Sequence, residues 1–158
     1  AVKLEYQVKS GFIFNFAKFV EWPPAATATA SFRIAVLDDG VAFNVLSNEL
    51  AGKIIGGKPV EVVHAQVKNL TNECRIVFIA RSQSARAEEV RKQLGDAPVL
   101  TIGESERFTE RGGCINFIRK GENIRFEINL AAAEQAKLKL SSKLAAMATL
   151  VKKKEAAQ

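Results

Sequence analysis

Aromatic and aliphatic side chains recur at helical spacing near the start of the chain. Within residues 3–22, large apolar residues stand three or four positions apart, which predicts a helix with one apolar face. That face consists of Phe12, Phe16, Phe19 and Val20. The pair Pro23-Pro24 is expected to end the helix, because proline cannot donate a hydrogen bond to the backbone ladder.

Short apolar runs alternate with more polar segments through the middle of the chain. The runs that predict buried strands are residues 32–37, 59–65, 74–80 and 98–102. Helices are expected over residues 41–51 and 81–95, each followed or ended by glycine. Strands that alternate with helices indicate a mostly parallel sheet with helices on both faces.

The last third of the chain changes character. Residues 114–129 predict two strands joined by a turn at residues 120–123. A short helix over 130–136, a brief extended segment over 137–140 and a final helix capped by Ser141 are expected to follow. The apolar side of this final helix would contain Leu144, Met147, Leu150 and Val151. The predicted fold is α/β and Rossmann-like, with a C-terminal antiparallel hairpin and one domain over residues 1–158.

Several polar residues interrupt these apolar faces. Asn116, Glu127 and Asn129 alternate with apolar residues in the hairpin. They indicate either its solvated face or a polar network that joins the hairpin to a helix or binds a partner. Trp22, just before the prolines, fits either a partner anchor or a lid on the core.

Composition narrows the class of protein. The chain has 158 residues, 47% of them hydrophobic, and a formal net charge of +6. No stretch of about 18 apolar residues is present, so no membrane span is expected. Lysines concentrate after residue 136, which fits a solvated helix end or attraction to an acidic partner or membrane. No basic and aromatic motif of a nucleic-acid-binding protein accompanies them, so nucleic acid is not an expected partner.

No catalytic constellation can be assembled from these residues. His64 is the single histidine, and no G-x-S-x-G elbow, phosphate-binding loop or G-x-G-x-x-G fingerprint is present. The spacing of Cys74 and Cys114 does not suit zinc, so these residues are either buried thiols or a disulfide. We therefore assign no catalytic, cofactor-binding or metal-binding residue and expect no cofactor and no enzymatic activity.

Ordered motifs along the chain resemble one known family. The segment EYQVKSGFIFNFAKFVEWP is followed in register by FRIAVL, LAGKIIGGKPVEV, CRIVFIA and PVLTIGE. The end, GGCINFIRKGENIRFEINLAAAEQAKLKLSSKL, is the most specific part. Together these motifs, over roughly residues 4–151, resemble the YfiR family of bacterial periplasmic proteins.

The resemblance implies a regulatory function. The namesake of the family represses an inner-membrane diguanylate cyclase by binding its periplasmic sensor region, which lowers cyclic di-GMP and affects biofilm formation. An outer-membrane lipoprotein relieves that repression. By the same resemblance we expect an exported, periplasmic homodimer from which a signal peptide has been removed.

The resemblance also suggests where to look for functional residues. The expected interface is the outer surface of the first and last helices, and its members are Trp22, Lys18, Glu21, Lys143, Met147 and Leu150. An oxidising periplasm favours a disulfide between Cys74 and Cys114.

A second function stays open: a periplasmic small-ligand-binding sensory module. Its site would lie at the carboxyl ends of the strands, where open α/β sheets bind ligands. The residues expected there are Asp38, Asp39, Arg81, Ser82, Gly103 and Glu104.

Overall fold

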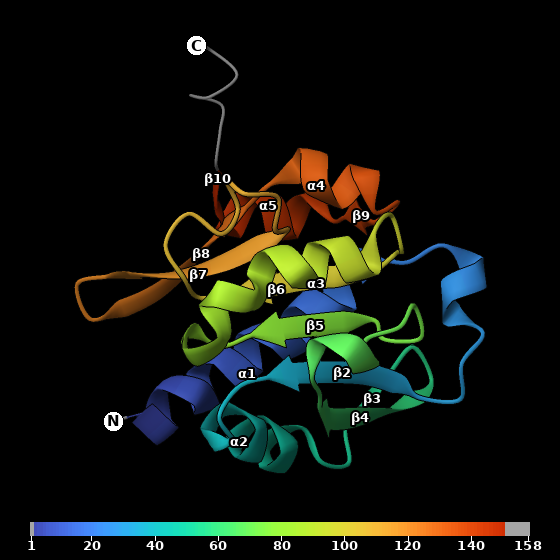
Figure 1. Cartoon of the computed structure of the whole chain (residues 1–158), viewed down its shortest axis with the longest axis horizontal. Coiled ribbons are helices and arrows are strands. Elements are labelled where there is room, and N and C mark those ends of the chain that lie inside the picture. Colours follow the sequence, from blue (N-terminus) through green and yellow to red (C-terminus); the bar gives the residue numbers. More distant parts are fainter. Residues whose placement is uncertain (1, 151–158) are drawn as a thin grey trace.

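The computed structural model describes residues 2–150 and contains one large mixed sheet (Figure 1). Along the sheet the strands follow the order β10-β8-β7-β6-β5-β2-β4-β3. Their bounds are β2 Phe32–Leu37, β3 Ile54–Ile55, β4 Lys58–His64, β5 Ile76–Ile79, β6 Leu100–Gly103, β7 Ile115–Lys120, β8 Asn123–Ile128 and β10 Thr149–Leu150. The run β4-β2-β5-β6-β7 is parallel, and β8 returns antiparallel to β7 as the predicted hairpin.

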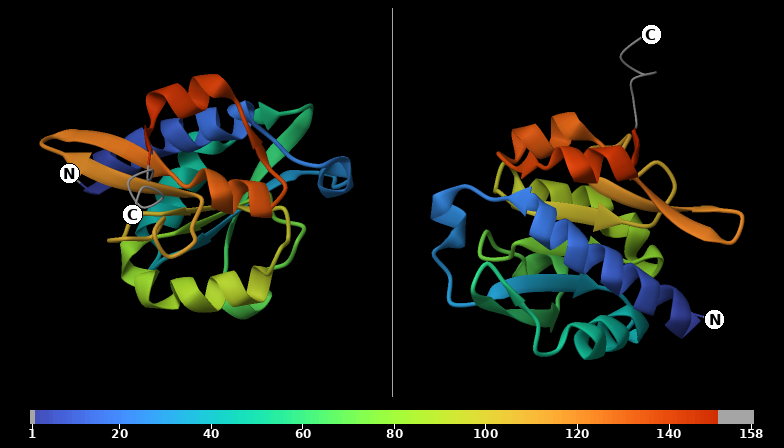
Figure 2. Two further views of the ribbon diagram at one scale, coloured as in Figure 1. Left: turned by 90° about the horizontal axis from the view of Figure 1, so that it is seen from above. Right: turned by 180° about the vertical axis from the view of Figure 1, so that it is seen from behind.

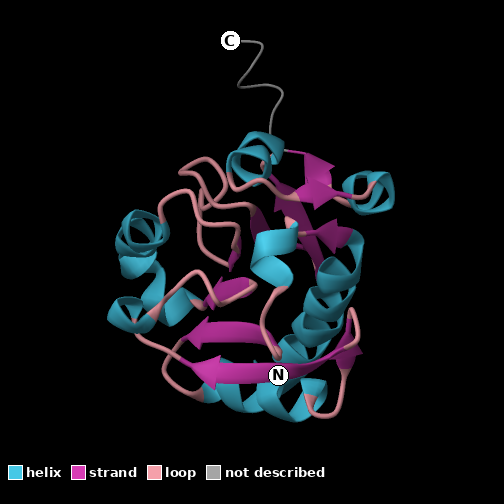
Figure 3. Cartoon of the chain, turned by 90° about the vertical axis from the view of Figure 1, so that its right-hand side faces the viewer, coloured by secondary structure: helices cyan, strands magenta, loops and turns pink. Residues whose placement is uncertain are grey.

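Helices cover both faces of this sheet (Figures 2 and 3). On one face lie α1 (Val2–Phe19) and α2 (Val41–Leu50), and on the other lie the short helices η2 (Val67–Asn69) and η3 (Arg81–Arg86) with α3 (Ala87–Leu94). The remaining elements are β1 (Val20–Glu21), η1 (Pro24–Thr27), α4 (Leu130–Gln135), β9 (Lys139–Leu140) and α5 (Ser142–Met147). The predicted fold class is confirmed.

Alternate residues of each strand supply two separate hydrophobic clusters. In β2, Ile34 and Val36 face α1 and α2, whereas Ala35 and Leu37 pack toward α3. On the α1 side, phenyl rings interlock, and the centroids of Phe16 and Phe126 lie 4.7 Å apart. The predicted apolar stripe of the first helix is therefore the surface that attaches α1 to the hairpin.

Both terminal helices are shorter than the sequence predicts. The first helix ends at Phe19, because Val20 and Glu21 leave it to pair with Leu140 and Lys139 in an antiparallel two-strand ladder. The prediction that it continues to residue 22 is wrong. Val20 and Glu21 form a strand and not a further helical turn, because β9 supplies partners for their backbone hydrogen bonds.

The final helix also ends early. Ser141 caps α5 as predicted, since its hydroxyl accepts a hydrogen bond from the Lys143 N–H at 3.0 Å. The helix then stops at Met147, and Leu150 belongs to β10, which pairs with β8. The predicted placement of Leu150 on a helix is wrong, and Val151 lies outside the described residues.

A buried ion pair fixes α1 to the end of the sheet. Glu104 follows β6, and its side chain is fully shielded from solvent. One carboxylate oxygen accepts from Lys9 Nζ at 2.5 Å, while the other accepts from the Tyr6 hydroxyl at 2.6 Å and the Arg81 backbone N–H at 2.8 Å. Three donors from two elements thus replace the water that this carboxylate loses on folding.

The ion pair continues to the surface through Glu5. Lys9 Nζ also lies 2.5 Å from Glu5, whose other oxygen accepts from Arg119 of β7 at 3.1 Å. Burial raises the pKa of Glu5, but the hydrogen bond and charge of Lys9, together with Arg119, outweigh burial and hold that pKa below its usual value. We call Glu5, Tyr6, Lys9 and Glu104 the helix lock.

The helix lock should contribute strongly to stability. Replacing Lys9 with methionine leaves Glu104 buried without its charged partner, so the free energy of unfolding should fall by about 3–5 kcal/mol. Urea denaturation followed by circular dichroism measures this change. Lys3→Met, on an exposed part of the same helix, should leave stability nearly unchanged, and an equal loss in both variants would contradict the assignment.

Tyr6 is the single tyrosine of the chain, so its titration can be followed directly. Burial, and then the hydrogen bond to Glu104, raise the pKa of its phenol far above the usual value of about 10. Native protein should therefore show no phenolate absorbance as the pH passes through about 10, whereas urea-denatured protein should titrate there. Because the folded state disfavours ionisation, this group's contribution to stability is complete below the unfolded pKa and is lost as the pH rises above it.

A tyrosinate transition near the ordinary pKa in protein that remains folded would show that Tyr6 is not locked against Glu104. Circular dichroism at each pH distinguishes that result from alkaline unfolding.

Candidate functional site

The structure brings the end of the first helix and the start of the last helix side by side. The backbone N–H of Ser141 donates to the Phe19 carbonyl at 2.9 Å, next to the β1–β9 ladder. Figure 2 shows α5 lying along α1, although the two helices are far apart in sequence. The two segments expected to form the interface therefore share one surface.

Four of the six expected interface residues belong to these two segments and have solvent-accessible side chains, and their contact with a partner stays a prediction. Lys18, Glu21 and Lys143 are exposed, and Met147 keeps 53% of its surface accessible. Leu144, one turn from Met147, is buried and attaches α5 to the core. We call the surface formed by Lys18, Glu21, Lys143 and Met147 the α1–α5 face.

The other two expected interface residues do not support the prediction in the same way. Trp22 is half-buried, its indole N–H donates to the Arg75 carbonyl at 3.2 Å, and its ring meets Phe32 edge-on at 5.3 Å. Trp22 therefore packs on the core as a lid would, and its role as a partner anchor stays a prediction. The backbone of Leu150 lies in β10, and its side chain is outside the described residues.

The polar residues of the hairpin hold the loop between β6 and β7. Asn116 is buried and donates to the Ser105 carbonyl at 2.9 Å, and Asn129 donates to the Thr109 carbonyl at 2.8 Å. The Thr109 hydroxyl donates to Glu127 at 3.3 Å. A polar network is thus formed: it joins the hairpin to this loop and, because the Asn129 side-chain oxygen accepts from the Ala132 N–H at 3.0 Å as the N-cap of α4, also to a helix.

Two glycines let the same loop pack closely on the sheet. The ring of Phe108 lies so near Gly103 and Gly113 that a Cβ atom at either position would come within 2.6 Å and 2.1 Å of it, respectively. No larger residue fits at either glycine while the ring stays in place. This loop and the helix lock together fill the strand ends around Glu104.

Consequently, part of the sheet edge expected to bind a ligand is occupied by the protein itself. Gly103 lies beneath Phe108, and Glu104 is fully used by the helix lock. Arg81 supplies its backbone N–H to Glu104, and the Arg81 and Ser82 side chains are exposed. These residues do not line a common crevice.

A crevice of about 830 Å³ opens instead farther along the same edge, beyond β2 and β4. Its residues are Leu37, Asp38, His64, Ala65, Gln66, Val67, Lys68, Gln83, Arg86, Glu89, Lys92 and Gln93. Of the expected ligand-site residues, Asp38 alone belongs to it, whereas Asp39 is exposed beside it on the chain. Sequence reasoning missed the rest, because the walls come from η2, η3 and α3.

The two cysteines do not form the expected disulfide. Both thiols are free and buried, and burial raises the pKa of each. Strand register places Cys114 level with Val77 of β5, three residues beyond Cys74 and two strands away. At about 3.3 Å per residue and 4.8 Å per strand, the Cα atoms are roughly 14 Å apart. A disulfide needs a separation below about 7 Å, so the sheet itself prevents this pairing.

The described residues contain neither a membrane-crossing helix nor a metal site. Among residues 2–150 no helix is both long and apolar enough to span a bilayer. The same residues contain no group of three or more histidine, cysteine, aspartate and glutamate side chains placed to hold a metal ion.

A comparison with known protein families finds a match for this chain. The profile of the family described as YfiR/HmsC-like matches residues 6–149, from α1 to β10. The chain belongs to the YfiR/HmsC-like family. Proteins of this family are periplasmic regulators, so membership supports a regulatory role for the YfiR/HmsC-like chain.

Solved structures share the fold at low sequence identity. A conserved domain protein from Vibrio cholerae O1 biovar eltor superposes with a TM-score of 0.67 at 12% identity, covering 90% of this chain and 60% of that one. The ABC domain from Streptococcus pneumonia, solved in complex with L-Trp, gives a TM-score of 0.56 at 10% identity, covering 79% of this chain and 58% of that one. The chain thus spans about three fifths of each structure's length. A comparison with curated proteins finds no match.

The two thiols of the YfiR/HmsC-like chain should be countable. Unfolding under non-reducing conditions in the presence of iodoacetamide should add two carbamidomethyl groups per chain, whereas native protein should react slowly because both thiols are buried with raised pKa values. Mass spectrometry gives the count. An unfolded, non-reduced chain that lacks two hydrogens and resists alkylation would show that the cysteines are bridged.

Proposed function

We propose that this chain is a periplasmic negative regulator that binds the sensor region of an inner-membrane diguanylate cyclase and lowers cyclic di-GMP. The observation that carries the proposal is the family match over residues 6–149, which includes both segments of the α1–α5 face. The cyclase would catalyse its reaction in the cytoplasm, so the regulator itself needs only a binding surface.

The chemistry of the α1–α5 face suits a protein partner. Met147 offers an adaptable apolar side chain, and Lys18, Glu21 and Lys143 add exposed charges of both signs in the same two segments. Lys18 Nζ lies 4.9 Å from the centroid of the Phe14 ring, which holds its charge close to the helix surface. An apolar centre with a polar rim is the usual composition of a specific interface.

This surface is also fixed in shape before any partner arrives. The β1–β9 ladder joins the two helices, and the buried residues Phe16 and Leu144 attach them to the core. A preformed surface loses little conformational entropy on binding, which favours affinity.

Regulation would depend on the fraction of sensor regions that the regulator occupies. If the bound regulator prefers the inactive arrangement of the sensor, the population of active cyclase falls by the ratio of the two affinities. Release would occur when an outer-membrane lipoprotein sequesters the regulator. The proposal includes self-association of the regulator as a homodimer.

Charge and size changes on the α1–α5 face should weaken partner binding. We expect Lys143→Glu combined with Met147→Asp to raise the Kd for the purified periplasmic region of the cyclase at least about tenfold, which corresponds to about 1.4 kcal/mol. Isothermal titration calorimetry measures the affinity, and cyclic di-GMP in cells that export the variant should rise above the level with wild-type protein.

The matched control is Lys120→Glu, a charge reversal on the exposed tip of the hairpin. It should bind and repress like the wild type. If the paired variant also behaves like the wild type while it remains folded, the interface lies elsewhere. If wild-type chain neither binds the sensor region nor changes cyclic di-GMP, the proposed function itself is wrong.

A further inference from the structure

The crevice beyond β2 and β4 lies where open α/β sheets bind ligands. The chain passes from β2 to β4 on one side and then crosses to β5 on the other side of β2, so the connections diverge at this strand. Ligands bind preferentially at the carboxyl ends of strands beside such a switch point. The volume of about 830 Å³ falls in the range of small-molecule sites.

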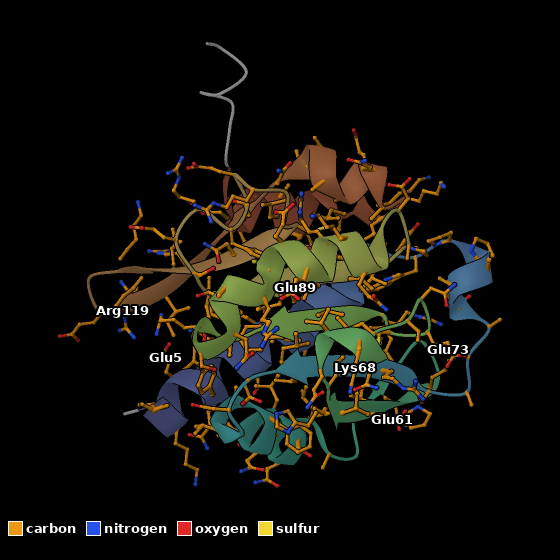
Figure 4. All side chains as sticks on the ribbon, in the orientation of Figure 1. Glu5, Glu61, Lys68, Glu73, Glu89 and Arg119 are labelled. Atoms are coloured by element: carbon orange, nitrogen blue, oxygen red, sulfur yellow. The ribbon has the colours of Figure 1, made fainter. Side chains whose placement is uncertain are left out.

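The walls of the crevice carry a surplus of positive charge. Lys68 on η2 and Lys92 on α3 form no ion pair with any other residue of the described chain. Arg86 is also positive, but Glu89 lies 3.2 Å from it and compensates its charge. Figure 4 shows Lys68 on η2 and Glu89 on α3 as parts of the same face of the molecule.

One of the residues that line the crevice carries an acceptor without a donor. The Asp38 side chain is 1% exposed, and its Oδ2 accepts from the Phe43 backbone N–H at 2.8 Å. His64 Nε2 lies 2.9 Å from Oδ1 and 3.1 Å from the Asp38 carbonyl oxygen, but only the contact with the carbonyl has hydrogen-bond geometry. Oδ1 is therefore buried and unsatisfied, which is costly unless something supplies a donor.

The imidazole that borders this acceptor packs against an aromatic ring. The His64 ring stacks on Phe43 with centroids 5.0 Å apart and an interplanar angle of 14°. His64 is the last residue of β4, and Phe43 belongs to α2, so the imidazole lies between these two elements next to the Asp38 carboxylate. Asp38 Oδ1 calls for a hydrogen-bond donor on a ligand, whereas Lys68 and Lys92 call for negative charge.

We propose that this crevice binds a small organic oxyanion that also carries a hydrogen-bond donor. The oxyanion, a phosphate or a carboxylate, binds Lys68 and Lys92, and a hydroxyl of the same molecule donates to Asp38 Oδ1 once the His64 ring, which is 44% exposed, turns away from that oxygen. This binding site is separate from the α1–α5 face, since the crevice lies on the α3 side of the sheet and α1 on the other. The inference does not depend on the identity of the protein partner.

Three probes distinguish the chemistry in a test on the whole chain. Glycerol 3-phosphate carries a phosphate and hydroxyls, glycerate carries a carboxylate and hydroxyls, and glycerol carries hydroxyls alone. Isothermal titration calorimetry at millimolar ligand should detect binding of at least one anion and none of glycerol. Binding should weaken as sodium chloride is added, because exposed charges are screened. Binding of only one anion would support the proposal and name the source of the oxyanion, whereas binding of neither, or of glycerol equally, would overturn it.

Variants locate the site. Lys68→Gln combined with Lys92→Gln should raise the Kd of the bound anion at least about tenfold. Lys3→Gln combined with Lys120→Gln removes the same charge from exposed positions outside the crevice and should leave the Kd nearly unchanged. An equal effect in both pairs, or no effect in the first, would overturn the placement.

Asp38→Asn provides an independent test of the donor. It keeps an oxygen that can accept from Phe43 but replaces the unsatisfied acceptor with an amide N–H, so affinity for the anion should fall while circular dichroism stays unchanged. If this variant does not fold, the unchanged fold of the lysine variants, whose side chains are exposed, still allows the test to decide. Failure of these experiments would leave the binding of a cyclase sensor unaffected, and the reverse also holds.

Discussion

The position of α1 depends on one buried ion pair. Lys9 and Glu104 are both almost fully shielded, and neither charge could stay buried without the other and without the Tyr6 and Arg81 donors. The pair therefore specifies which part of α1 lies over the end of β6. The phenyl rings of Phe12 and Phe16 supply area but little direction, so the polar contact sets the register of a largely apolar attachment.

The α1–α5 face and the crevice beyond β2 and β4 both depend on the position of α1. With α1 fixed, Val20 and Glu21 reach β9, and the ladder brings the first turn of α5 beside the end of α1. On the carboxyl edge of the sheet, the helix lock and Phe108 fill the space around Glu104. The open space at that edge lies instead at the ends of β2 and β4.

Local sequence signals predicted the main elements, but they did not predict a contact between distant residues. The strand Phe32–Leu37 and the hairpin of β7 and β8 appeared where they were expected, because apolar periodicity and turn residues are local properties. The buried role of Lys9 was missed, although Glu5 and Lys9 stand four residues apart on a helix. That spacing fits an exposed ion pair as well as a buried one. Lys9 is buried because it also contacts Glu104, which lies 95 residues away in the chain.

The sequence by itself determined the α/β class, the order of the main elements and the family, and the α1–α5 face stays a prediction. Only the tertiary structure decided that Trp22 covers the core, that Cys74 and Cys114 stay apart, and that Leu150 pairs in a strand. It also brought Asp38, His64 and Lys68 to one crevice. The periodicity of apolar residues shows which side of an element is buried. The distance between two cysteines, the burial of a charged side chain and the hydrogen-bond donors that it meets depend on residues that are distant in the chain.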